Sequence, residues 1–187
     1  MTVRIGYRHC DPRFPFLWQS AAQPAARWHG QDEGPANYFS DTPTGAWAEF
    51  LRHEGITDEA DLAGVQRSLW AVEMPLTDAA AVPQLPDAVL FGAEPSYAAC
   101  QQEARRLRAL GHTGLDVVGA ALLPGQARGW TADASTVRDP SPRDGLVWVH
   151  FGPCPFVGWV IVKAGSPPPD VLPLVRQLRS PGPLRNL

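Results

Sequence analysis

The sequence predicts an α+β fold in one domain, with small mixed sheets and helices. Three observations support this. The chain has 187 residues, which is enough for one sizeable core and too few for two comfortable domains. Strand-like segments occur near both ends of the sequence. Helical patterns lie between them, and this order is typical of α+β proteins.

The N-terminal part begins with a predicted strand at 2–8, where apolar residues alternate loosely. The stretch 9–36 that follows is long, irregular and rich in proline and aromatic residues. Loops of that length inside compact domains are usually functional or disordered. Because its apolar side chains at 14–18 would be costly to expose, we expect it to fold over a core or a cleft. A short strand is predicted at 37–40.

A helix is predicted at 43–54 from its start and stop residues. Thr42 can cap the helix, Pro43 suits the first helical position, and Gly55 suits the stop. The segments after it are predicted as a short helix or turn at 57–64, a buried strand at 66–76, a loop over most of 77–95, an amphipathic helix at 96–111 ending on Gly111, and a strand followed by a Gly- and Pro-rich loop over 114–130.

Two further strands are predicted at 145–151 and 156–162, and they are candidates for neighbours in the sheet. The segment 164–187 is a proline-rich tail that holds one short helix. We therefore expect a single domain over 1–187, without internal repeats.

The charge pattern argues against nucleic acid as a direct partner. The net charge is −3, and no basic patch or charged tail is present. Lys163 is the only lysine, and the excess of arginine over lysine fits a genomic composition bias. The arginine content is therefore no sign of a polyanionic ligand.

The three cysteines are widely spaced and odd in number, which makes a disulfide framework or a zinc site improbable and fits a reducing compartment. We expect no metal. The N-terminus lacks the apolar core of a signal peptide, and no run approaches the roughly 18 apolar residues that span a bilayer. We therefore expect a soluble, cytoplasmic protein without membrane contact.

Arg27, Tyr38 and Glu49 recur at intervals of eleven residues and raise the question of a site. Each residue also has a structural explanation. Glu49 lies on the predicted helix, either turned to solvent or held in a cleft, and helix geometry alone does not decide between these. Tyr38 could be a core aromatic residue with a satisfied hydroxyl, and Arg27 could lie on the surface.

Several segments together resemble the RES domain, the toxins of bacterial toxin–antitoxin pairs. The segments are "YRH" at 7–9, "ARWHG" at 26–30, "NYFSDTPTGAWAEF" at 37–50, "GHTGLDVVGAALLPGQARGW" at 111–130 and the closing "VWVHFGPCPFVGWVIV". The similarity spans roughly residues 4–163, and the order and spacing of Arg, Tyr and Glu are its most specific part.

This resemblance implies an ADP-ribosyltransferase-like fold and a toxin that cleaves the nicotinamide–ribose bond of NAD⁺, as a glycohydrolase, phosphorylase or ADP-ribosyltransferase. Carried over by position, it implies a catalytic Glu49 and an NAD-binding set of Arg8, Arg27 and Tyr38. It also implies a helix-turn-helix antitoxin as partner.

The implied roles suit the chemistry of these side chains. A guanidinium can clasp a pyrophosphate with two parallel hydrogen bonds, as Arg8 or Arg27 would. The Tyr38 ring can stack on nicotinamide. Breaking the glycosidic bond develops oxocarbenium character on the ribose, which a fixed carboxylate such as Glu49 can stabilise.

One departure from the family pattern concerns its late serine. This residue should fall near 119, where the chain has Gly119 followed by two alanines. Losing the hydroxyl removes a polar contact from the site. The alternative function is therefore a degenerate, non-enzymatic RES-fold protein that binds a nucleotide or a partner protein.

Overall fold

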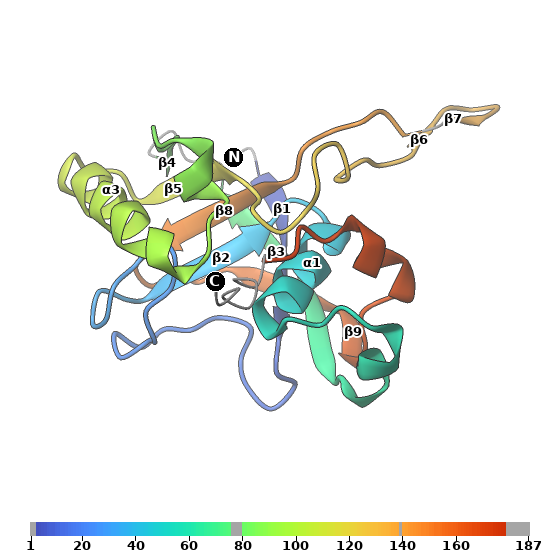
Figure 1. Cartoon of the computed structure of the whole chain (residues 1–187), viewed down its shortest axis with the longest axis horizontal. Coiled ribbons are helices and arrows are strands. Elements are labelled where there is room, and N and C mark those ends of the chain that lie inside the picture. The colour runs from blue at the N-terminus through green and yellow to red at the C-terminus, as the bar shows by residue number, and fades with distance from the viewer. Residues whose placement is uncertain (1–2, 76–79, 139, 179–187) are drawn as a thin grey trace, which may run out of the picture.

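The centre of the fold is a mixed β-sheet (Figure 1). The structure is a computed structural model that describes residues 3–75, 80–138 and 140–178, and within these residues the sheet has seven strands. In order across the sheet they are β4 (Ala80–Ala81), β5 (Gly114–Val118), β8 (Leu146–Phe151), β2 (Ala36–Ser40), β1 (Val3–Cys10), β3 (Arg67–Pro75) and β9 (Val157–Gly165). Strands β4 and β5 pair in parallel and the other neighbours are antiparallel.

The helices and a small ribbon complete the described part of the chain. The helices are α1 (Pro43–Glu54), α2 (Asp87–Leu90) and α3 (Tyr97–Ala109), with 3-10 turns η1 (Glu59–Gly64), η2 (Glu94–Ser96) and η3 (Pro169–Leu174). Strands β6 (Thr131–Ala132) and β7 (Val137–Arg138) form a two-stranded ribbon that projects away from the body of the molecule (Figure 1). The predicted combination of mixed sheet and helices is confirmed, although most strands join one large sheet.

Helix α1 begins and ends as its sequence predicts. The Thr42 side chain accepts a hydrogen bond from the Gly45 N–H at 3.0 Å, and Pro43 occupies the first turn. Gly55 ends the helix with a φ of 66°, a left-handed conformation that glycine adopts without steric cost. These local signals fix the position of Glu49 on the helix.

One face of the sheet packs against the helices in two adjoining hydrophobic clusters. Under α1, Trp47 and Leu51 pack with Leu69 of β3 and with Val171 of η3. The second cluster lies under α3 and joins residues of that helix to β5, β8 and the start of β2, among them Leu107, Leu115, Val149 and Ala36. Tyr38 packs against this second cluster, so it lies on the helix-covered face.

The opposite face is covered by loop segments around Phe39, Val72 and Met74. Phe16 stacks on Trp70 with 4.8 Å between the ring centroids. The irregular segment before β2 therefore folds over a core, as its apolar content predicts. Its later residue Trp28 is buried on the helix-covered side, so the segment passes from one face of the sheet to the other.

Strands β8 and β9 are not neighbours, contrary to the sequence prediction. β8 lies between β5 and β2, whereas β9 pairs with β3. The residues between them cross the loop-covered face, where Phe156 contacts the rings of Phe39 and His150 at 5.9 and 5.0 Å. Burying this aromatic residue draws the chain beneath β2, β1 and β3, away from the adjacent edge of β8.

The segment predicted as mostly loop at 77–95 contains more structure than expected. Its described part holds β4, α2 and most of η2, while 77–79 lie outside the described residues. The predicted short helix of the proline-rich tail is η3, and 179–187 lie outside the described residues.

Replacing Gly114 by alanine is expected to destabilise the sheet. A Cβ there would lie 2.6 Å from the Val149 carbonyl oxygen, so β5 and β8 would have to separate. Strain of this kind costs about 1–3 kcal/mol of unfolding free energy, measurable by urea denaturation. Gly64→Ala is the matched control, because nothing lies within 4 Å of its Cβ position. Equal stabilities of the two variants would contradict the close packing at Gly114.

Candidate functional site

Helix α1 places Glu49 and Arg52 three residues apart on neighbouring positions of its surface. Glu49 is half-buried and lines a small hollow together with Ser40 and Asp41, which lie at the end of β2 and just after it. The far side of the hollow is formed by Gly119 and Ala121, just after β5, and by residues around Gly145. The carboxylate is therefore held between helix, sheet and loop.

Burial raises the pKa of the Glu49 carboxyl group above its usual value. Several groups oppose this shift, first the charges of Arg52 and Arg27 and then the backbone N–H of Ala121 as a hydrogen-bond donor. His53, on the same helix, has a smaller effect in the same direction. Glu49 is thus a desolvated carboxylate with two guanidinium groups nearby, which is the kind of environment found at functional sites.

The Arg52 side chain ties three segments together beneath the site. The residue is 5% exposed, and burial lowers its pKa while the charge of Glu49 raises it. One terminal nitrogen donates to the Ala120 carbonyl, and the other donates to the Phe91 carbonyl at 2.7 Å and the Gly92 carbonyl at 3.3 Å. The guanidinium therefore fixes both the chain after β5 and the segment after α2 relative to α1.

Arg27 reaches the same segment from the N-terminal loop. Its terminal nitrogens donate to the carbonyls of Val89 at 3.2 Å and Gly92 at 2.8 Å, and its guanidinium lies 4.6 Å from the centre of the Tyr97 ring. Arg27 and Arg52 thus share one acceptor, the Gly92 carbonyl. The predicted residue Arg27 is directed into the molecule, and its charge acts on Glu49.

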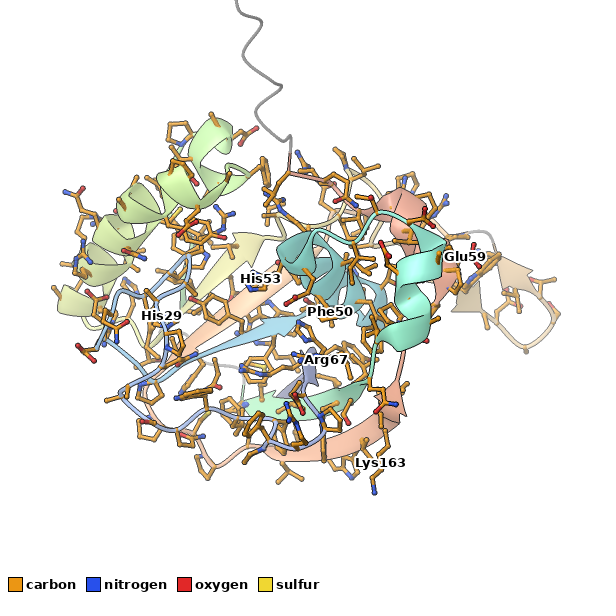
Figure 2. The ribbon with its side chains drawn as sticks, turned by 60° about the horizontal axis from the view of Figure 1, so that its bottom comes forward. His29, Phe50, His53, Glu59, Arg67 and Lys163 are labelled. Carbon is orange, nitrogen blue, oxygen red and sulfur yellow. The ribbon has the colours of Figure 1, made fainter. Side chains whose placement is uncertain are left out.

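Tyr38 lies on β2 with its hydroxyl group satisfied. The hydroxyl accepts a hydrogen bond from the Trp28 N–H at 3.1 Å and bonds the Nδ1 atom of His29 at 2.8 Å. Burial raises the pKa of Tyr38, whereas the Trp28 N–H and the charges of Arg8 and, to a smaller extent, Arg27 act in the opposite sense. Figure 2 shows His29 on the side of the sheet where α3 lies. Arg27 is thus close enough for its charge to act on both the Tyr38 hydroxyl and the Glu49 carboxylate.

The charge of Arg8 also acts on Tyr38, but its side chain lies on the other face of the sheet. On β1 it points to the loop-covered face, where it lies 6.0 Å from the Phe39 ring and donates to the Asn37 Oδ1 atom at 3.1 Å. Its neighbour Tyr7 packs on the side of α1, since successive side chains of a strand alternate between faces. The sheet therefore lies between the Arg8 side chain and Glu49. The NAD-binding role of Arg8 stays a prediction.

A wider cleft of about 820 Å³ opens next to the hollow that holds Glu49. The two share Gly119, Leu122 and Gly145, so Glu49 lies beside the floor of the cleft. The cleft is lined by the segment after α2, the chain after β5 and the C-terminal segment, in particular Phe91 and Arg176. Its size suits a small-molecule ligand.

Gly119, which the family resemblance predicts to stand in place of a serine, lines both the cleft and the hollow. A Cβ at this position would lie 3.4 Å from the Gly145 carbonyl oxygen and 3.6 Å from the nearest Val147 side-chain atom. These are ordinary van der Waals distances. The backbone has therefore not closed into the space, and a side chain could stand there.

Sequence reasoning missed two arginines of the site, Arg52 and Arg176. Arg52 carried a weak signal, since an acid and a base three residues apart on a helix form a neighbouring pair. Arg176 carried none, because it lies in the proline-rich tail far from every predicted site residue in the sequence.

Within the described residues, no group of three or more His, Cys, Asp or Glu side chains could hold a metal ion. Cys10, Cys100 and Cys154 are buried free thiols. No helix in the described part of the chain is long and apolar enough to cross a membrane.

Comparison with known families identifies the domain. The family description of the RES domain matches residues 3–136, which is most of the chain. The chain belongs to the RES domain family. The match contains α1 and the whole Arg27–Tyr38–Glu49 series, whereas β8, β9 and η3 lie beyond it.

A solved structure has the same fold as this RES domain. A chain of the M. tuberculosis MbcT–MbcA toxin–antitoxin complex superposes with a TM-score of 0.59 at 14% sequence identity, covering 92% of this chain and 88% of that chain. At this identity the likeness establishes the fold. No curated protein sequence matches the chain.

Arg52→Gln is expected to lower the free energy of unfolding by about 2–4 kcal/mol, because three carbonyl oxygens lose a charged donor in a buried position. Chemical denaturation measures this change. Arg105→Gln is the matched control, since its ion pair with Glu33 is largely exposed and contributes at most about 1 kcal/mol. If Arg52→Gln lowers the free energy of unfolding no more than Arg105→Gln does, the hydrogen bonds of Arg52 do not stabilise the fold.

Proposed function

We propose that this RES domain cleaves NAD⁺ at the bond between nicotinamide and ribose. The observation that carries the proposal is the half-buried Glu49 carboxylate, set beside the floor of a cleft and flanked by Arg27 and Arg52. Arg27, Tyr38 and Glu49 occupy the positions of the family motif, and all three lie on the helix-covered side of the sheet. The cleft is large enough for part or all of a dinucleotide.

The proposed reaction breaks the bond between ribose C1′ and the nicotinamide nitrogen. The bonding electron pair leaves with nicotinamide, which becomes neutral, and positive charge develops on the ribose. Glu49 stabilises that charge and can accept a hydrogen bond from a ribose hydroxyl group. An acceptor then forms the new bond at C1′; with water, the products are ADP-ribose and a proton. Phosphate or a protein side chain are the other acceptors in this proposal.

Tyr38 serves in this proposal as a fixed aromatic surface. Its hydroxyl is held by the Trp28 N–H and by His29, so the ring is oriented while the hydroxyl has partners of its own. The nicotinamide ring can stack on such a surface. A role in proton transfer is less suited to it, because burial raises the pKa of the hydroxyl further from neutrality.

Glu49→Gln is expected to reduce nicotinamide release by roughly 10²–10³-fold, the usual effect of removing one charge-stabilising group from an active site. Glutamine has nearly the same size as glutamate but carries no charge. For the wild type, activity should fall on the acid side at a pH above the usual carboxyl pKa of 4.5, because burial raises the pKa of Glu49 and only the carboxylate stabilises the ribose cation. Chromatography of nicotinamide after incubation with NAD⁺ measures both effects.

The control is Glu54→Gln, on the same helix but exposed, which should retain full activity. Folded Glu49→Gln protein with wild-type turnover would remove Glu49 from the mechanism. Folded wild-type protein that releases no nicotinamide would favour the alternative, a non-enzymatic RES domain that binds a nucleotide or a partner, for which the absent serine at Gly119 is the supporting observation.

We further propose that the domain is the toxin of a toxin–antitoxin pair and that a helix-turn-helix antitoxin binds it. The family and the fold shared with a chain of a toxin–antitoxin complex support this. A small protein encoded next to the gene is the candidate partner. On co-expression it should co-purify with the domain and suppress nicotinamide release, and a neighbour that neither binds nor inhibits would count against the pairing.

A further inference from the structure

Arg176 lines the cleft, whereas Arg27 and Arg52 do not, and its guanidinium is used differently from theirs. Arg27 and Arg52 direct their terminal nitrogens at backbone carbonyls. Arg176 donates only through Nε, to the Leu122 carbonyl at 3.4 Å, and within the described residues no hydrogen bond or ion pair involves its two terminal nitrogens. Its terminal nitrogens therefore have N–H donors that no other described residue uses, in a side chain that lines the cleft.

The position of this guanidinium is fixed from two sides. Its central carbon lies 4.2 Å from the centre of the Phe91 ring, a stacking arrangement, while the Arg176 backbone N–H donates to the Ala121 carbonyl at 2.6 Å. Phe91 is itself held, because its carbonyl accepts from Arg52. Both Arg176 and Phe91 line the cleft. A stacked guanidinium loses little further freedom when it binds, and its two terminal nitrogens, which bond no other described residue, match two oxygens of a phosphate.

The charges around Arg176 are of both signs. Arg52 lies close enough to Arg176 and to Arg27 for each to lower its pKa, after the larger effect of burial. Two carboxylates, Asp87 and Asp144, also line the cleft, and one oxygen of Asp144 already accepts the Gly125 N–H at 2.8 Å. Arg27 and Arg52 do not line the cleft, so they favour an anion beside Arg176 only through their charge, which acts from behind the cleft wall.

We propose that Arg176 is a substrate-binding residue that holds a phosphate group of the dinucleotide, and that the C-terminal segment around it is part of the binding site. This inference rests on the proposed cleavage of NAD⁺. The phosphate lies in the wide cleft, and the reacting ribose lies at the side of the cleft nearest Glu49, where Gly119, Leu122 and Gly145 line both the cleft and the small hollow. Because Arg176 acts at a distance from the broken bond, it contributes to binding and not to the chemical step.

The test uses the full chain, with ADP-ribose as the probe. Arg176→Gln should raise the Kd for ADP-ribose by about 10–100-fold, the usual effect of losing a charged hydrogen bond. It should raise the KM for NAD⁺ in parallel and leave kcat close to that of the wild type. Arg176→Lys, which keeps the charge without the planar fork, should fall between. Calorimetry and nicotinamide release measure these quantities.

Arg138→Gln is the matched control, because it removes the same charge from the projecting ribbon and should change neither Kd nor KM. A folded Arg176→Gln protein with wild-type Kd for ADP-ribose would overturn the inference and show that Arg176 only packs on Phe91. If the variants do not fold, hydrogen exchange of the wild type decides: ADP-ribose should protect residues 171–178, and no protection at saturation overturns the inference.

The two proposals fail differently. Wild-type protein that binds ADP-ribose through Arg176 but releases no nicotinamide would refute the cleavage and support the binding role. Wild-type protein that cleaves NAD⁺ while Arg176→Gln keeps its Kd and KM would refute the binding role alone. Wild-type protein that neither binds ADP-ribose nor releases nicotinamide would overturn both.

Discussion

The buried guanidinium of Arg52 ties three parts of the chain together at one point. Its donors meet the carbonyls of Ala120, Phe91 and Gly92, while its charge lies beside Glu49. A buried cation of this kind needs both carbonyl oxygens and a nearby negative charge, since either alone leaves part of its desolvation uncompensated. The walls of the cleft and the ionisation of Glu49 therefore depend on the same side chain.

The two faces of the sheet differ in what they support. On the loop-covered face, aromatic side chains pack around Phe39, and Arg8 donates a hydrogen bond to Asn37. The helix-covered face supports the site. There Phe50 of α1 and Arg67 of β3 lie close together (Figure 2), with the Arg67 Cζ atom 5.1 Å from the centre of the Phe50 ring. Since α1 follows β2 after a very short connection, Tyr38 and Glu49 are placed by a local unit, and the parts of the cleft contributed by later segments are added to it.

The sequence predicted what local signals determine. Thr42, Pro43 and Gly55 located α1 and with it Glu49. Long-range pairing carries no such signal: nothing around Phe156 shows that its burial under the sheet will part β8 from β9. Alternation in β1 indicated that Tyr7 and Arg8 point to opposite faces but could not say which face carries the helices. Arg176 is still harder to predict, because its role depends on contacts with Ala121, Leu122 and Phe91, all distant in sequence.

The Arg176 N–H bonds the Ala121 carbonyl, and the Ala121 N–H faces Glu49. The surroundings of the carboxylate thus include residues from almost the whole length of the chain. During synthesis, Glu49 leaves the ribosome well before the segment around Arg176. A nascent chain therefore has β2 and α1 outside the ribosome before the cleft has its last wall. Until that segment emerges, the cleft next to Glu49 lacks the wall that the residues around Arg176 provide.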